Sequence, residues 1–310
     1  MSTRVGSVRS IHRFPVKSMC GEDLERCQVG VDGLRGDRAF ALRDETAGEI
    51  RGGKRWPRLM VCSARYGAEP AETGVTHAAI ALPDGRTTST DDPAAARLLS
   101  EWLDCKVTLH PRMPASDTRH YRRVQPGASI AGMLARTPLL RKTMARLATL
   151  GPGGRELRAD FGREPGEPMP DLSVFPPELF GYVAPLGTYF DAYPIHVLTT
   201  ATLAALREKD PERDWDARRF RANFVVETDE ALHGLVEAAW QGRELRIGEL
   251  RLQCTVATPR CSMVMQAQPA LRKDAGVLRT IVREAEQCVG VYARVTQPGR
   301  VALGADVDLI

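Results

Sequence analysis

The feature that most constrains this chain is a succession of short strand-like segments without regular alternation of strand and helix. Turn pairs such as Asp32-Gly33 and Asp84-Gly85 separate these segments. The predicted strands span residues 5–14, 26–31, 38–43, 60–66, 78–82, 106–109, 195–198, 224–227, 245–247, 250–256 and 289–296. Because parallel α/β folds place a helix after most strands, the pattern favours an α+β fold, mostly β, that contains a barrel.

Two helices and a hairpin-like end accompany these strands. A helix over residues 93–103 opens with Asp91-Asp92-Pro93, which supplies a cap and a first-turn proline. A second helix follows Thr199-Thr200, which can cap residues 201–206. Residues 299–310 are predicted to form the hairpin-like end.

Residues 115–188 differ in character and are interpreted as an insertion that could form a lid. Their apolar residues recur at helical spacing among cations, and a Pro/Gly-rich stretch follows. The apolar positions are Met133, Leu134, Leu139, Leu140, Met144, Leu147 and Leu150. Such a basic amphipathic helix could dock on a membrane or a partner, but the favoured interpretation is a surface helix that covers its own domain. The predicted domains are a β-rich unit over residues 1–114, the insertion, and a barrel unit over residues 189–310.

Composition excludes several classes. The chain has 310 residues, of which 43% are hydrophobic, and a net charge of +4 that fits an anionic small ligand as well as nucleic acid. Its seven cysteines form no C-x-x-C pair, which argues against a disulfide framework, a structural zinc site and an iron–sulfur cluster. No apolar signal segment or membrane-spanning stretch is present, so we expect a soluble cytoplasmic protein.

Cys261 is the leading candidate for chemistry. It follows an alternating strand pattern in Thr258-Pro259-Arg260-Cys261-Ser262, which places a thiol beside a guanidinium on a proline-stiffened segment. A thiolate is a soft ligand for a transition metal, and a neighbouring cation favours the ionised form. Two alternatives stay open at this stage: a small buried hydrophobic residue, or a nucleophile paired with His196.

Scattered cations suggest a phosphate site. Lys17 and Ser18 follow the first strand, Arg38 precedes a later one, and Arg221 and Asn223 lie in a cluster with Arg218 and Arg219. The Thr199-Thr200 helix start would expose unpaired N–H groups. Each segment alone is more often a solvated turn, and a nucleic-acid patch would need more aromatic residues than Phe220. Together they suggest a phosphorylated or polyanionic small ligand.

In this order, these residues resemble the MOSC superfamily, the molybdenum cofactor sulfurase C-terminal domain with its N-terminal β-rich partner. The matching segments are Phe14-Pro15-Val16-Lys17-Ser18, Gly36-Asp37-Arg38-Ala39-Phe40, Leu198-Thr199-Thr200-Ala201-Thr202-Leu203, Phe220-Arg221-Ala222-Asn223, Pro259-Arg260-Cys261 and Gly290-Val291-Tyr292. The branch it most resembles is the mitochondrial amidoxime-reducing component and its bacterial counterparts. Where that branch commonly has a Thr-Thr pair after the cysteine, this chain has Met263-Val264-Met265, which puts the substrate pocket in doubt.

The resemblance implies a site built around a molybdenum cofactor (Mo-molybdopterin). Cys261 would supply a thiolate to molybdenum, and the remaining residues would bind the pterin. The terminal phosphate would be held by Lys17, Ser18, Arg38 and Arg221. The residues expected to line the pterin or the metal pocket are Asp191, Thr199, Thr200, Asn223, Pro259 and Tyr292.

The expected activity is a molybdenum-dependent reduction of N-hydroxylated small molecules, with no role for pyridoxal phosphate. Electrons would come from a separate ferredoxin, flavodoxin or cytochrome. We expect a monomer with no nucleic-acid partner and no stable membrane insertion, in which residues 115–188 narrow access to the metal without holding the cofactor. The alternatives are a non-redox sulfur carrier or cofactor-binding module, and a tailoring enzyme of secondary metabolism.

Overall fold

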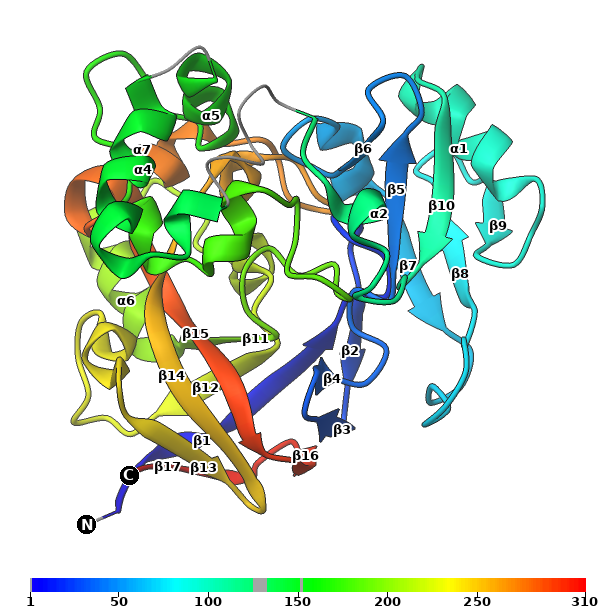
Figure 1. Cartoon of the computed structure of the whole chain (residues 1–310). Helices are drawn as coiled ribbons and strands as arrows, with labels where there is room; N and C mark the ends of the chain where they lie inside the picture. The colour runs from blue at the N-terminus through cyan, green and yellow to red at the C-terminus, as the bar shows by residue number, and fades with distance from the viewer. Residues whose placement is uncertain (1, 125–132, 151–152) are drawn as a thin grey trace.

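A closed barrel forms the centre of the molecule. In the computed structural model, the structure describes residues 2–124, 133–150 and 153–310. Within them, seven strands close on themselves in the order β12-β11-β15-β14-β13-β17-β1, because β1 pairs with both β17 and β12. They are β1 (Thr3–Arg13), β11 (Ile195–Thr199), β12 (Phe224–Thr228), β13 (Glu244–Ile247), β14 (Leu250–Pro259), β15 (Cys288–Gln297) and β17 (Asp306–Leu309). Figure 1 shows them crossing below the helices, with both chain ends at the lower edge.

Alternating residues of these strands fill the barrel. Val8, Val197, Leu252 and Val291 are among its buried apolar residues, as expected for strands that turn every second side chain inward. Gly6 allows β1 to bend between its two partners, since it has φ +151° and a Cβ there would lie 2.0 Å from the Glu227 carbonyl oxygen. The prediction of a mostly-β α+β fold with a barrel is confirmed.

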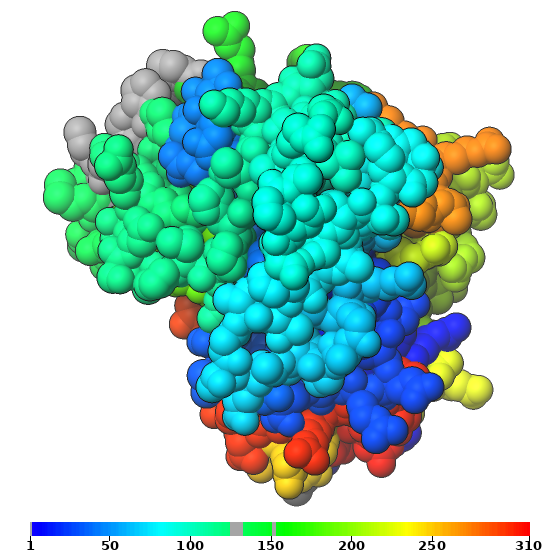
Figure 2. All heavy atoms as spheres, turned by 90° about the vertical axis from the view of Figure 1, so that its right-hand side faces the viewer, coloured from blue at the N-terminus to red at the C-terminus, as the bar shows by residue number. Residues whose placement is uncertain are grey.

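The N-terminal half packs small sheets around a second core. One sheet has the order β10-β5-β6 and another β7-β8-β9, and α1 covers residues of both. Their bounds are β5 (Phe40–Asp44), β6 (Glu49–Arg51), β7 (Ser63–Tyr66), β8 (Ala78–Ala81), β9 (Thr87–Ser89), α1 (Ala95–Leu103) and β10 (Val107–Pro111). Figure 2 views the molecule from the side of this half, whose surface stands above the end of the barrel.

The two halves share strands. A third small sheet has the order β16-β3-β4, in which β16 (Gly299–Ala302) near the C-terminus pairs with β3 (Arg26–Gly30), followed by β4 (Gly33–Leu34). The predicted hairpin-like end is therefore wrong, because β16 and β17 pair with different strands instead of with each other. Near the other end of the chain, β2 (Glu22–Leu24) pairs with β1.

Helices cover one end of the barrel. α6 (Thr200–Lys209) and α7 (Ala275–Glu284) bury their apolar faces in a common cluster with Leu198 and Phe220. The helix α7 escaped prediction, although its Asp274 cap and its Val277, Leu278, Ile281 and Val282 spacing are typical of one. Short 3₁₀ turns complete this region: η4 (Ala217–Phe220), η5 (Val236–Trp240) and η6 (Ser262–Met265).

The central segment lies over the same end. It contains α2 (Thr118–Tyr121), α4 (Pro138–Leu150), α5 (Gly154–Asp160), η2 (Leu172–Val174) and η3 (Pro177–Phe180). The helix predicted from the Leu/Met spacing is present as α4, a surface helix that packs against α5 and η2, but its leucines do not form the packed face. Its leucines face outward, with Leu139 90% and Leu150 80% exposed.

Candidate functional site

Two predicted cations meet on one aromatic ring where β1 ends. The guanidinium carbons of Arg38 and Arg221 lie 4.6 and 4.2 Å from the centre of the Phe14 ring. Arg38 also donates a hydrogen bond to the Arg221 carbonyl at 3.3 Å, and Arg221 donates to the Met19 carbonyl at 2.8 Å. The two positive charges repel each other, and an anion bound beside them would relieve this repulsion.

Three of the predicted residues have strained backbone. Ser18, Arg38 and Arg221 have φ values of 72°, 46° and 55°, a region that non-glycine residues seldom occupy. Strain of this kind persists where the surrounding structure enforces it, and it clusters at binding sites. Ser18 is also covered closely by Gly52, since a Cβ at that glycine would lie 2.5 Å from the Ser18 hydroxyl oxygen.

Lys17 forms the third cation of the group and pairs with Asp191. Its ammonium donates to the Asp191 carboxylate at 2.6 Å and to the Tyr189 carbonyl at 2.8 Å. Burial lowers the pKa of Lys17 below its usual value despite this partner. Burial opposes ionisation of Asp191, but the ammonium groups of Lys17 and Lys54 outweigh it and lower the Asp191 pKa. Burial and the neighbouring charges thus act in opposite directions on both members of the pair.

Lys54 links this cluster to the thiol. Burial disfavours its charge, yet the electrostatic attraction of the Cys261 thiol and then of Asp191 raises the Lys54 pKa above its ordinary value. The ammonium also lies 5.5 Å from the centre of the Phe161 ring. Lys54 was not predicted from the sequence, and the glycine pair that precedes it was the available signal.

Asp37 and Asn223 brace the cluster from inside. The buried Asp37 accepts hydrogen bonds from the Phe14 amide at 2.8 Å and from the Asn223 side chain at 3.1 Å, and it pairs with Arg38. Asn223 also donates to the His12 carbonyl and accepts from the His196 amide. The Asn223 amide thus joins β1 to β11. Four cations, Lys17, Lys54, Arg38 and Arg221, stand against the carboxylates Asp37 and Asp191 and, beside Lys54, Asp160, which leaves a positive excess that suits an anionic group.

Cys261 lies where β14 gives way to η6, with both neighbours fixed. Pro259 is buried and pairs with Cys288 of β15. The Arg260 guanidinium donates to the Phe220 carbonyl at 2.9 Å, and the Ser262 hydroxyl donates to the Asp160 carbonyl at 2.8 Å. The half-buried thiol is thereby held by backbone on each side.

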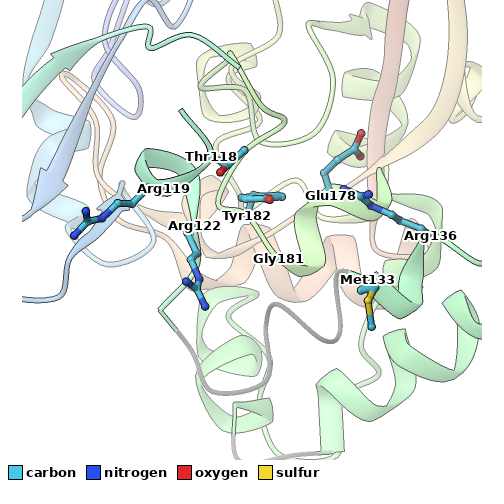
Figure 3. A pocket seen from close by; sticks show the side chains of 8 residues that line it. All are labelled: Thr118, Arg119, Arg122, Met133, Arg136, Glu178, Gly181 and Tyr182. Atoms are coloured by element: carbon cyan, nitrogen blue, oxygen red, sulfur yellow. The ribbon is translucent and has the colours of Figure 1, made fainter. Parts of the chain in front are cut away.

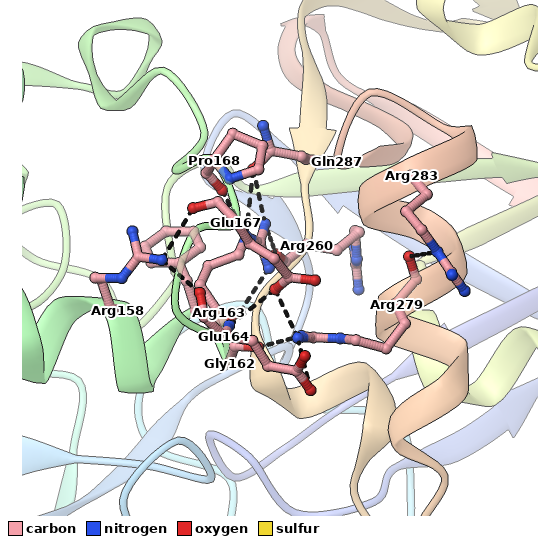
Figure 4. Close-up of polar contacts among 11 residues, drawn as sticks. Arg158, Gly162, Arg163, Glu164, Glu167, Pro168, Arg260, Arg279, Arg283 and Gln287 are labelled. Atoms are coloured by element: carbon pink, nitrogen blue, oxygen red, sulfur yellow. Dashed lines mark hydrogen bonds and ion pairs between the residues drawn. The ribbon is translucent and has the colours of Figure 1, made fainter.

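The central segment reaches this loop through Arg163. Its buried guanidinium donates to the Arg260 carbonyl at 3.1 Å and to the Gln287 side chain at 3.1 and 3.2 Å. Figure 4 shows Arg163 between Arg260 and Gln287, with Arg279 reaching Gly162 and Glu167 from α7. Arg163 was not predicted from the sequence, because the alternating apolar pattern that predicts strands does not extend to this residue.

Apolar side chains of the same segment surround the thiol. Ala145, Phe161 and Leu172 form a buried cluster against which Cys261 packs. Partly buried members of this cluster are Leu157, Met169, Phe175 and Phe180. A molecule that reaches the thiol from this side therefore meets apolar and aromatic surface.

Tyr292 and His196, on the paired strands β15 and β11, are the remaining aromatic candidates for the site. Their rings lie 5.5 Å apart, and burial raises the Tyr292 pKa, with Asp191 adding to the effect. Burial, with Arg260 and Arg38, lowers the His196 pKa well below its usual value, so the imidazole is neutral. Gly290 is required here, since a Cβ at that position would lie 2.2 Å from His196 Nε2. Among the described residues no hydrogen bond joins His196 to Cys261, and nothing supports a Cys–His nucleophile.

Two family models match this chain. One, described as the MOSC domain, matches residues 187–308, and the other, the MOSC N-terminal beta barrel domain, matches residues 5–103. The chain belongs to the MOSC-domain family. The family predicted from six short motifs is thereby confirmed, while the finer resemblance to the amidoxime-reducing component stays a prediction.

Solved structures similar to this MOSC chain are distant. The YUAD protein from Bacillus subtilis is 10% identical, with 100% of this chain and 98% of that chain covered, at a TM-score of 0.41. YiiM from Geobacillus stearothermophilus is 19% identical over 38% of this chain and 54% of its own, at a TM-score of 0.28. YiiM from Escherichia coli is 17% identical over 41% of this chain and 59% of its own, at a TM-score of 0.30. The match therefore spans little more than half of either YiiM chain. No curated protein matches the chain.

Among the described residues, no hydrogen bond joins Thr199 or Thr200 to the four cations, and their expected role in lining the pterin or the metal pocket stays a prediction. Thr199 caps α6 by accepting from the Thr202 amide at 3.1 Å, and its own amide donates to buried Glu237 at 2.5 Å. Thr200 bonds to Thr228 at 3.2 Å. The Glu237 carboxylate therefore lies beside the helix start that was expected to expose unpaired N–H groups, where it also accepts from the Thr202 hydroxyl, and burial raises its pKa.

A separate cavity lies beyond the region that the MOSC models match. It has a volume of about 550 Å³ and is lined by Thr118, Arg119, Arg122, Met133, Arg136, Glu178, Gly181 and Tyr182 (Figure 3). Cys261 is not among these residues. Neither Arg122 nor Arg136 forms an ion pair with any residue in the described ranges.

No group of three or more His, Cys, Asp or Glu side chains among the described residues could hold a metal ion. None of the described helices has both the length and the apolar character needed to cross a membrane.

Proposed function

We propose that this protein binds a molybdenum cofactor through the Cys261 thiolate and reduces N-hydroxylated compounds with electrons from a separate protein. The observation that carries the proposal is the position of Lys54. Its ammonium lies 5.5 Å from the centre of the Phe161 ring, which belongs to the cluster against which Cys261 packs, and its charge also acts on the Asp191–Lys17 pair. A soft metal ligand and an anion-binding cluster of cations thus belong to one site. A metal bound to a phosphorylated organic group needs both.

The residues present fit such a group. The thiol is a suitable donor for molybdenum, and the cations exceed the carboxylates near Phe14. Two polar atoms, His196 Nε2 and Arg260 Nε, are buried without a hydrogen-bond partner among the described residues, which leaves hydrogen-bonding capacity for a polar ligand. Cys261 would hold the metal, while Lys17, Arg38, Arg221 and Ser18 would hold the terminal phosphate.

The chemistry divides between cofactor and chain. The cofactor, when bound, supplies two-electron transfer to the N–O bond of the substrate. Cys261 would anchor it, and the apolar cluster around Phe161 shields one side of the thiol from water. Tyr292, whose pKa is raised by burial, keeps its proton at neutral pH and can donate a hydrogen bond. Asn223 acts indirectly, by holding Asp37 and so Arg38.

Metal and activity measurements on purified protein test the proposal. We expect molybdenum and pterin in equal amounts with the protein, and dithionite-driven reduction of an aromatic N-hydroxyamidine. Protein that lacks molybdenum after expression in a cofactor-producing host, and carries cyanide-releasable sulfur on Cys261 instead, would contradict the proposal and favour a sulfur carrier.

A further inference from the structure

Helix α4 presents a stripe of leucines to solvent. Leu139, Leu140, Leu147 and Leu150 are 90%, 41%, 52% and 80% exposed. At 100° per residue they fall within an arc of about 100° on one face of the helix. Within α4, whose residues are all described, only Ala145 is buried. Neighbouring α7 does the opposite and buries its apolar face, so the outward stripe is a property of α4 itself.

The surroundings of the stripe are basic. Arg146 and Lys142 are exposed and flank the leucine arc on one side. Between Asp117 and Glu156 the sequence contains eight Lys and Arg residues and no Asp or Glu. Met133, which precedes α4 in the sequence, is 65% exposed. Exposed leucines beside cations, with no carboxylate among them, are typical of a helix that lies in a membrane interface.

We propose that α4 is an interfacial helix that docks this protein on a bilayer with anionic headgroups. The leucines would enter the acyl boundary, while Lys142 and Arg146 would meet the headgroups. Thirteen helical residues extend about 20 Å, too short to span the hydrocarbon core, so the contact is peripheral. Anionic lipid is the favoured occupant because a second copy of this surface would oppose cation to cation.

The inner face of α4, opposite the leucines, contacts the site around Cys261. Ala145 packs into the apolar cluster that includes Phe161, Leu172 and Cys261. A protein bound through the leucines would hold that cluster directly above the lipid surface, where apolar substrates concentrate. This consequence rests on the proposed function, whereas membrane binding itself does not.

Vesicle sedimentation tests the docking independently of molybdenum. The full-length protein is mixed with vesicles of phosphatidylcholine alone or with added phosphatidylserine. We expect binding to the anionic vesicles that weakens as salt rises. The double variant Leu139→Ser/Leu150→Ser should bind at least about tenfold more weakly, because each leucine loses apolar area that would leave water. The pair Lys142→Glu/Arg146→Glu should also lose about tenfold.

Matched controls are available on the same chain. Val31 and Leu303 are 69% and 45% exposed, far from α4 in sequence, so Val31→Ser/Leu303→Ser should bind like the wild type. Unchanged far-UV circular dichroism shows that each variant is folded. Absence of binding to anionic vesicles, or binding that the leucine variant leaves unchanged, would overturn the proposal. Self-association in solution that the leucine variant abolishes, without vesicle binding, would overturn it in favour of a dimer.

Discussion

At the scale of single residues, the position of the thiol is set by its neighbours. Arg260 and Ser262 are anchored on different segments, to Phe220 and to Asp160, and Cys261 itself adds only a half-buried side chain to the core. Its replacement should therefore separate chemistry from folding.

Cys261→Ala should abolish turnover and molybdenum retention while the thermal midpoint stays near that of the wild type. Cys261→Ser is the sharper variant, since a hard hydroxyl oxygen binds molybdenum less well than a soft sulfur. Metal analysis and differential scanning calorimetry check both. Full molybdenum content in Cys261→Ala would show that another residue is the ligand.

Lys17, Arg38 and Arg221 should act on cofactor retention more than on the chemical step. Each alanine variant removes a charge-assisted hydrogen bond of about 1.5–3 kcal/mol, or roughly ten- to a hundredfold in affinity. Pairs of variants should be non-additive, because the cations would share one phosphate. Pterin content after dialysis measures this, with exposed Arg97→Ala on α1 as the control. Undiminished pterin in all three variants would exclude a phosphate site here.

His196 should make stability depend on pH. Its folded-state pKa lies well below the ordinary value of about 6.5. Below that value the unfolded chain binds the proton and the folded chain does not, so its contribution is fully present above pH ~6.5 and is lost as pH falls. The slope is at most about 1.4 kcal/mol per pH unit.

His196→Phe should flatten this dependence in urea titrations between acidic and neutral pH, whereas exposed His233→Phe should not. Some slope should persist, since burial also lowers the pKa values of His110 and His120. An unchanged slope in His196→Phe would show that this imidazole is not held neutral.

At the scale of elements, the central segment takes part in the site instead of only covering it. Asp160 and Arg163 contact the residues on either side of Cys261, while Arg55 of the N-terminal half pairs with Asp160 at 3.2 Å. The expectation that this segment takes no part in holding the cofactor stays a prediction. Excising it would also remove these contacts, so a point variant is the cleaner test.

Arg163→Lys keeps the positive charge but removes the guanidinium group that donates to both the Gln287 side chain and the Arg260 carbonyl. We expect a stability loss of about 1–3 kcal/mol and faster release of the cofactor. The matched control is exposed Arg155→Lys on α5. Unfolding curves and the rate of molybdenum loss give the two readouts. Wild-type values for both would show that Arg163 does not position the loop.

Local sequence patterns were sufficient to predict the strands and the individual cations. They could not predict contacts between residues that lie far apart in the sequence. Alternation predicted β11 and β14, and the cap predicted at Thr199 is present. Nothing local indicated that Glu237, 38 residues away, would lie beside that helix start. Arg38 and Arg221 were predicted separately, but their meeting on Phe14 depends on a fold that joins residues 183 apart.

At the scale of the whole molecule, the N-terminal half and the barrel are joined because each contains a strand that pairs with strands of the other. β1 enters the barrel from the N-terminal side, and β16 leaves it to pair with β3. Neither half can lose its structure without unpairing strands of the other.

We therefore expect the halves to unfold in one transition. Trp102 reports on α1 and Trp240 on the barrel. Variants that retain one of these tryptophans, with the others replaced by Phe, should give coincident urea midpoints by fluorescence. Midpoints that differ between probes in the same variant background would show that the halves unfold independently.

The closure of the barrel by β1 has a consequence for synthesis on the ribosome. Ile11 pairs with Phe224, and Thr3 pairs with Leu309. Leu24 of β2 pairs with Ile11 soon after it is made, but at about 5–20 residues per second roughly 10–40 s pass between translation of Ile11 and of β12, its first partner strand within the barrel. During that interval Val5, Val8 and Ile11, all buried in the finished barrel, lack the other barrel strands against which they pack. The nascent chain should therefore need a holding chaperone on this strand, and slowing elongation should increase its aggregation.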